Sequence, residues 1–190
     1  MIGFNTYIEG LDLSELKTYF VNHGRSTQYA KGNYFVKEGE ESRYIAYIEC
    51  GYFNYKVHNS SEGKDYITGL AFEGEFVGDY PNCLSGKTSE VTIVAGTSCK
   101  VYQLAGEELC NLLDSDGMRD LKLAISDHLF SQVYTQYLDT YRMTTRERYK
   151  RLLLRCPEIV QSINLKDIAS YLKVTPTTIS NIRREITFGL

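Results

Sequence analysis

The sequence has no tryptophan, only three prolines and three histidines, and no long uncharged apolar run. A membrane-spanning helix needs roughly 18 to 20 consecutive apolar residues, so the sequence excludes an integral membrane protein. The N-terminal stretch carries Glu9, Asp12 and Glu15 and lacks the apolar core of a secretion signal. We therefore expect a cytoplasmic protein with no membrane partner.

Closely spaced metal ligands are also missing. The cysteines and histidines stand far apart, at Cys50, Cys83, Cys99, Cys110, Cys156, His23, His58 and His128. Zinc sites and iron–sulfur clusters need ligands at short spacing, and metal-dependent enzymes built on double-sheet rolls need two or three histidines with a carboxylate. We expect no metal, no cofactor and no catalytic site, and we interpret the isolated cysteines as small buried hydrophobes. The sequence argues against an enzyme.

Charge is distributed unevenly along the chain. Residues 1–141 contain 11 Lys/Arg and 20 Asp/Glu, whereas residues 142–190 contain 10 and 4. An acidic body followed by a basic segment indicates two domains, of which the second faces a polyanion such as nucleic acid. A solvated helical surface that is basic by chance would explain the charge alone equally well.

The periodicity of the apolar residues changes along the chain. Between about residues 31 and 103, short alternating runs such as 44–48, 52–57 and 91–94 are separated by glycines. This pattern predicts an antiparallel sandwich or roll, preceded by a helix over 11–21. After residue 103 the spacing becomes helical, and 118–141 contains neither glycine nor proline.

The long helix predicted over 118–141 has two apolar stripes. One consists of Leu121, Ile125, Leu129, Val133 and Tyr137, and the other of Phe130, Tyr134, Leu138 and Tyr141. Two stripes predict burial on two sides, one against the roll and one against the same helix of a second subunit. The alternative is that the second side covers the C-terminal segment of the same chain. We assign the dimer interface to Leu121, Ile125, Leu129 and Val133.

The C-terminal segment shows clear helix starts. Thr144 and Glu147 form a capping box, and Asn164 is a good N-cap. Thr175 caps a further helix, whose first position is taken by Pro176. Three short helices are expected. The last two have the aliphatic spacing of a helix-turn-helix around Ala169, with a turn over 173–175. The first residue of such a turn adopts a left-handed backbone conformation and is commonly glycine. Here it is Lys173, for which this conformation costs about 1 kcal/mol.

The last helix presents polar side chains that suit DNA. We predict a DNA-binding set of Thr175, Thr177, Thr178, Ser180, Asn181, Arg183 and Arg184. Thr177, Thr178 and Asn181 share one helical face and can reach base edges, and the two arginines suit phosphates. An ordinary helical hairpin is the alternative.

Two segments resemble a known family. The stretch 167–176, DIASYLKVTP, and the stretch 74–79, GEFVGD, are similar to the helix-turn-helix and the phosphate cassette of bacterial transcription regulators of the Crp/Fnr family. The resemblance covers nearly the whole chain. It implies an α+β fold with a cyclic-nucleotide-binding-like β-roll over 1–116, a dimerisation helix over 117–142 and a helix-turn-helix domain over 143–190. It further implies a homodimer that binds double-stranded DNA, with RNA polymerase and an unidentified small-molecule effector as possible partners.

The cassette departs from the family at the residues that bind phosphate. Asp79 stands where a glutamate meets the ribose, but ten residues later Ser89 and Glu90 replace the arginine and hydroxyl residue of nucleotide-binding members. Without the guanidinium the cyclic phosphate loses its main partner, so we expect no tight binding of cyclic AMP. We place the effector pocket at Gly78, Asp79, Lys87, Ser89 and Glu90. The alternative function is a regulatory module that binds a ligand or protein but not DNA.

Overall fold

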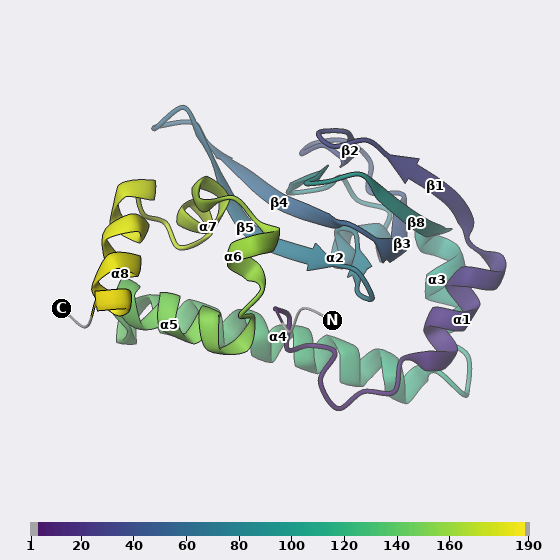
Figure 1. Ribbon diagram of the computed structural model, residues 1–190. Coiled ribbons are helices and arrows are strands. Elements are labelled where there is room, and N and C mark those ends of the chain that lie inside the picture. Colours follow the sequence, from purple (N-terminus) through teal and green to yellow (C-terminus); the bar gives the residue numbers. More distant parts are fainter. Residues whose placement is uncertain (1–3, 189–190) are drawn as a thin grey trace.

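The computed structural model describes residues 4–188, which form a double-sheet roll followed by a long helix and a small helical unit (Figure 1). The strands are β1 (Arg25–Tyr29), β2 (Tyr34–Val36), β3 (Tyr44–Cys50), β4 (Tyr52–Asn59), β5 (Lys64–Phe72), β6 (Phe76–Val77), β7 (Thr92–Ala95) and β8 (Cys99–Ala105). The helices are α1 (Ser14–His23), α2 (Tyr80–Leu84), α3 (Gly106–Leu113), α4 (Arg119–Arg142), α5 (Thr145–Arg155), α6 (Ile159–Ser162), α7 (Leu165–Tyr171) and α8 (Pro176–Phe188). No helix in this described range is both long and apolar enough to cross a membrane.

The roll consists of two four-stranded antiparallel sheets, with strand orders β1-β8-β3-β6 and β2-β7-β4-β5. The apolar residues that alternate along the strands meet between the sheets, where Ile48, Phe53 and Val101 are fully buried. Gly51, at a φ of 90°, makes the tight turn from β3 to β4, and a Cβ there would lie 2.6 Å from the Cys99 sulfur. The predicted antiparallel roll is confirmed. Of the cysteines interpreted as buried, Cys50 is exposed at this same turn.

Helix α4 packs on the roll through its N-terminal half. Ile125 is only 7% exposed, and Leu121 and Leu129 pack against the same apolar cluster, which also contains Phe20 of α1 and Leu113 of α3. Of the four residues predicted for the dimer interface, Ile125 therefore belongs to the core of its own chain, and Leu121 and Leu129 pack against that core while half-buried. The period of the helix is the reason, since Leu121, Ile125 and Leu129 lie on the face that turns toward the roll. Val133 alone among the four is exposed.

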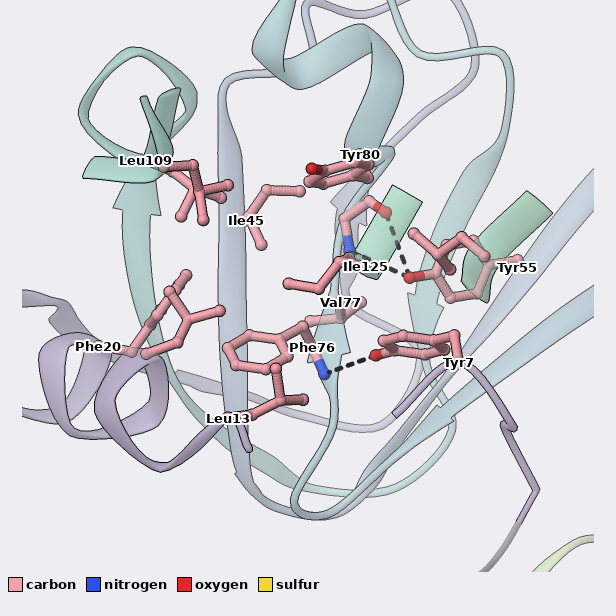
Figure 2. Close-up of a pocket in the computed structure, with 14 residues that line it drawn as sticks. Tyr7, Leu13, Phe20, Ile45, Tyr55, Phe76, Val77, Tyr80, Leu109 and Ile125 are labelled. Carbon is pink, nitrogen blue, oxygen red and sulfur yellow. Dashed lines mark hydrogen bonds between the residues drawn. The ribbon is translucent and has the colours of Figure 1, made fainter. Parts of the chain in front are cut away.

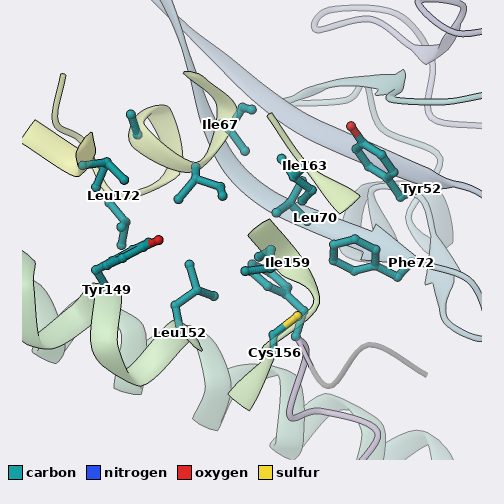
Figure 3. Close-up of a cluster of buried hydrophobic side chains, with 14 of the residues drawn as sticks. Tyr52, Ile67, Leu70, Phe72, Tyr149, Leu152, Cys156, Ile159, Ile163 and Leu172 are labelled. Carbon is teal, nitrogen blue, oxygen red and sulfur yellow. The ribbon is translucent and has the colours of Figure 1, made fainter. Parts of the chain in front are cut away.

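The C-terminal helices do not form a separate core. Figure 3 shows one apolar cluster in which Tyr149, Leu152 and Ile159 of α5 and α6 lie with Ile67 and Phe72 of β5. A hydrogen bond also joins β5 to α7, since the backbone N–H of Ile67 donates to the Ser170 hydroxyl at 2.9 Å. The helical unit therefore packs against the roll through β5.

The helix starts predicted in this region are present. The Glu147 N–H donates to the Thr144 hydroxyl, and the Thr144 N–H donates to the Glu147 carboxylate at 2.8 Å. The Asn164 side chain accepts from the Asp167 N–H at 2.8 Å. Four helices replace the three that were expected, because the short helix α6 follows Pro157 before the chain reaches Asn164.

Candidate nucleic-acid interface and sensor site

Helices α7 and α8 meet around a small apolar centre. Ala169 is buried where the two helices approach, and Ile168, Leu172 and Ile179 fill the angle between them. Lys173 has a φ of 56°, the left-handed conformation expected for the first turn residue. The turn is closed by the Val174 N–H, which donates to the Ala169 carbonyl at 2.9 Å. The sequence spacing of a helix-turn-helix therefore corresponds to its geometry here.

The first turn of α8 carries most of the predicted polar set. The Thr175 hydroxyl accepts from the Thr178 N–H at 3.1 Å and lies 2.9 Å from the Thr178 hydroxyl, so this cap leaves Thr178 half-buried. Thr175, Thr177, Ser180, Asn181 and Arg184 are exposed. Arg184 Nη2 donates to the Asn181 side-chain oxygen at 3.5 Å, so these two side chains are adjacent on the surface.

Arg183 occupies a different position from the one expected. Its Nε donates to the Tyr149 hydroxyl at 2.6 Å, and its guanidinium carbon lies 5.8 Å from the centre of that ring. Tyr149 is fully buried in α5, and Arg183 is itself half-buried. The predicted phosphate contact is therefore replaced by a structural one that fastens α8 to α5. Residue patterns carry no sign of this contact, because Tyr149 lies 34 positions away in another helix.

Several basic residues of the C-terminal half are also engaged within the chain. Asp139 of α4, almost fully buried, accepts from Arg142 Nε at 2.7 Å and forms a second ion pair with Arg151 of α5. Arg148 Nη2 donates to the Leu172 carbonyl at 3.2 Å, directly beside the turn of the helix-turn-helix. These arginines orient α5 and the turn. Lys166, Lys173 and Arg184 are exposed, and Arg146 of α5, also exposed, forms an ion pair with Glu185 of α8 at 3.8 Å.

The cassette at the start of α2 brings four of the five predicted pocket residues together, but its polar groups bond to each other. The Asp79 carboxylate oxygen Oδ2 accepts from the Ser89 hydroxyl at 3.0 Å, from the Glu90 N–H at 3.0 Å and from Asn82 Nδ2 at 2.9 Å. Ser89 is buried. The side chain of Lys87 is exposed to solvent. The carboxylate that would meet a ribose already has three donors from its own chain.

Aromatic side chains pack between the two sheets of the roll. Tyr29, Phe35 and Phe53 pack on one another with ring centres 5.6 to 5.9 Å apart. The Tyr55 hydroxyl accepts from the Gly78 N–H at 3.1 Å and lies 3.3 Å from the Gly78 carbonyl oxygen, to which it can donate. Gly78 itself has a φ of 150°, and a Cβ there would lie 2.4 Å from the Ile45 side chain. Tyr55 therefore occupies the inner side of the cassette at Gly78.

A buried carboxylate that sequence reasoning missed lies at the turn before β6. Glu75 is fully buried, and its Oε2 accepts from Asn5 Nδ2 at 2.6 Å and from the Phe72 N–H at 2.9 Å. Its Oε1 has no hydrogen-bond partner among the described residues. Desolvation by burial raises the pKa of Glu75 to about 7. Its place in the cassette motif is a variable one, so the pattern carried no sign of burial.

Asn5 connects Glu75 to the long helix. Its side-chain oxygen accepts from Gln132 Nε2 of α4 at 2.9 Å, and Gln132 Oε1 in turn accepts from the Tyr7 N–H at 3.1 Å. The cassette turn, the N-terminal segment and α4 thus share one polar network. Within residues 4–188, no group of three or more His, Cys, Asp or Glu side chains is placed to hold a metal ion.

Comparisons with known proteins agree with this geometry. Residues 26–116 match the model of the cyclic nucleotide-binding domain family. FixK2 from Bradyrhizobium japonicum has 20% identity and a TM-score of 0.71 over 87% of this chain and 86% of that chain. A transcriptional regulator of the Crp/Fnr family from Eubacterium rectale has 15% identity and a TM-score of 0.69 over 98% and 88%. The c-di-GMP-responsive regulator CLP from Xanthomonas campestris has 16% identity and a TM-score of 0.67 over 94% of this chain and 93% of that chain.

A search of proteins with curated functions finds no match. Residues 26–116 therefore match the cyclic nucleotide-binding domain, and the chain as a whole has the fold seen in the Crp/Fnr regulators, which confirms in fold the resemblance noted in its sequence.

Proposed function

We propose that this protein is a dimeric transcription regulator that binds a two-fold-symmetric site on double-stranded DNA through α8. The observation that carries the proposal is the exposed face of α8, where Thr177, Ser180 and Asn181 stand beside Arg184 on a helix fixed by a buried helix-turn-helix centre. Short hydroxyl and amide side chains suit base edges, and a guanidinium suits phosphate. The fold shared with Crp/Fnr regulators supports the same function.

The dimer is proposed to form through the outward face of α4. Leu123, Phe130, Tyr134, Tyr137 and Tyr141 follow one another at spacings of 7, 4, 3 and 4, the heptad spacing of a coiled-coil seam. They are large and apolar yet 51–75% exposed, on the side of α4 opposite Ile125. Stacking of Phe130 on Tyr134, with ring centres 5.7 Å apart, makes the stripe continuous. A second copy of the helix would cover it and would pair two α8 helices on one face of the DNA.

The exposed polar residues of α8 are expected to divide into a base contact and a phosphate contact. Asn181→Ala should cost roughly 1 to 3 kcal/mol at one A·T position of the half-site, because asparagine can bond adenine through two hydrogen bonds. Arg184→Ala should weaken binding to all sequences about equally and reduce the salt slope by about one unit. Bound fragments selected from a genomic DNA library supply the site, and fluorescence anisotropy at several salt concentrations measures both variants.

The matched control for the phosphate contact is Arg184→Lys, which keeps the charge and should keep the salt slope. An equal loss for specific and random DNA in Asn181→Ala would show that Asn181 is a backbone contact. The alternative function, a regulatory module that binds a ligand or protein but not DNA, predicts that no fragment is selected and that no salt-dependent DNA affinity is found.

Cyclic AMP and cyclic GMP are expected not to bind in the micromolar range. Ser89 offers a hydroxyl where a guanidinium would hold the phosphate, Asp79 is already bonded, and aromatic rings fill the roll. Ser89→Arg with Glu90→Ser is expected to recover some affinity, because it restores the guanidinium, but only part of it, because Ser89 is buried. Isothermal titration calorimetry checks both proteins, and a micromolar dissociation constant for the wild type would contradict this account of the cassette.

A further inference from the structure

Next to the cassette, outside the bonded carboxylate, lies an apolar cavity of about 110 Å³. Figure 2 shows it between Ile45 and Val77 of the roll, Phe20 of α1, Leu109 of α3 and Ile125 of α4. No charged side chain among the described residues lines it. Of the predicted pocket residues only Gly78 reaches it, whereas Asp79, Lys87, Ser89 and Glu90 do not. Its chemistry is therefore unlike that of a phosphate site.

Three tyrosines bring hydroxyl groups to this cavity, and two of these are already bonded. The Tyr7 hydroxyl accepts from the Phe76 N–H at 3.3 Å, and the Tyr55 hydroxyl bonds to Gly78. The Tyr80 hydroxyl oxygen is buried and has no hydrogen-bond partner within residues 4–188. A buried hydroxyl without a partner is unfavourable, so Tyr80 is a donor available to a bound molecule.

Size and polarity restrict what the cavity can hold. An engineered apolar cavity of about 150 Å³ stays dry and binds benzene, and an ordered water needs two to four polar partners. The single unpaired hydroxyl of Tyr80 gives a water cluster too few partners. A cyclic nucleotide or a haem is far larger than 110 Å³. The cavity volume is of the same order as that of the benzene-binding cavity, so the space suits a molecule about the size of a single ring.

We propose that this cavity is a binding site for a small neutral molecule, a single ring or short branched chain with one oxygen that accepts a hydrogen bond from Tyr80. This names the chemical class of the effector of the proposed regulator. Only the role of the ligand as an effector rests on that proposed function. Because Ile125 and Leu129 of α4 line the cavity together with Val77 and Gly78 of the cassette, a bound molecule contacts both the roll and the proposed dimerisation helix.

Phenol and toluene are suitable probes, since both have seven non-hydrogen atoms and only phenol carries an oxygen acceptor. Calorimetry on the full-length wild type should give a dissociation constant for phenol below about 1 mM, with toluene about tenfold weaker. Tyr80→Phe removes the donor without changing the cavity shape. The affinity for phenol should therefore fall about tenfold, and the affinity for toluene should be unchanged. Leu109→Phe fills the space and should abolish binding of both.

Absence of phenol binding at 1 mM to the wild type would overturn the proposal, as would binding that both variants leave unchanged. If Leu109→Phe fails to fold, the phenol-to-toluene ratio in Tyr80→Phe still decides the matter. These measurements contain no DNA. Phenol binding by a protein that selects no DNA fragment would therefore disprove the proposed regulator function and leave the cavity assignment standing.

Discussion

Replacing Tyr134 and Tyr137 together by glutamate is expected to convert the protein from a dimer into monomers. In the proposed dimer the double variant would bury two carboxylates from each protomer in an apolar seam, where charges without partners are strongly disfavoured. The dimer dissociation constant should rise at least a thousandfold. Because both side chains are more than half exposed in the single chain, the protomer itself should stay folded. Light scattering and circular dichroism measure the two properties separately.

Specific DNA affinity should fall with the loss of the dimer, because each protomer would then contact one half-site alone. Ser131→Glu is the matched control, since it adds a charge to an exposed position of α4 outside the seam. Tyr134→Phe with Tyr137→Phe should remain dimeric. A wild-type protein that is monomeric at micromolar concentration would contradict the seam. Leu129 is unsuitable for this test, since it packs in the core of its own chain.

Glu75→Gln is expected to stabilise the protein at high pH and to leave it unchanged at low pH. Burial raises the pKa of Glu75 from 4.5 to about 7, so the folded state binds a proton that the unfolded state has lost between these two values. The wild type therefore loses stability as pH rises from about 4.5 to 7, by roughly 2 to 3 kcal/mol. Glutamine is neutral throughout, so the free energy of unfolding of the variant should exceed that of the wild type by this amount at pH 8.

The groups that bear on the pKa of Glu75 are the Asn5 amide and the Phe72 N–H, which donate to it, and Lys17, which lowers it. Burial, and after it the negative charge of Glu75, raise the pKa of the neighbouring Tyr7 hydroxyl. Urea denaturation of both proteins at pH 4.5, 6 and 8 gives the comparison. Glu73→Gln, at an exposed neighbouring position, is the control that should show no such pH-dependent difference. A stability difference that is constant across this range would exclude Glu75 as the titrating group.

Local patterns in the sequence predicted the parts of the fold that depend on neighbouring residues. Alternation identified β3, β4 and β7 but not β1, which lies before the region expected to contain strands. The caps at Thr144, Asn164 and Thr175 identified helix starts, since each needs only a side chain and a backbone N–H three residues away. The left-handed turn at Lys173 could also be placed from the spacing of aliphatic residues around Ala169. These interactions are short in sequence and therefore visible in it.

The errors concern contacts between distant segments. Periodicity showed that α4 has two apolar faces, but which face meets the roll depends on α1 and α3, and Ile125 was assigned to the wrong side. Arg183 looked exposed because its partner Tyr149 belongs to another helix. Glu75 and Tyr80 gave no signal, since their burial results from the N-terminal segment and from helices brought together only in the folded chain. Tertiary packing determines which of these side chains are buried, and the local pattern of apolar and polar residues does not show it.

The apolar cluster that joins β5 to the C-terminal helices means that the two halves of this protein are not interchangeable modules. A boundary at residue 143 cuts through a single core, leaving Ile67 and Phe72 on one side and Ile159 and Ile168 on the other without the surfaces that cover them. Grafting these helices onto another roll would require a matching strand, not merely a matching linker. Exchange of the C-terminal helices between chains of this fold is therefore constrained by β5, because a substitution in this strand alters the surface on which α7 packs.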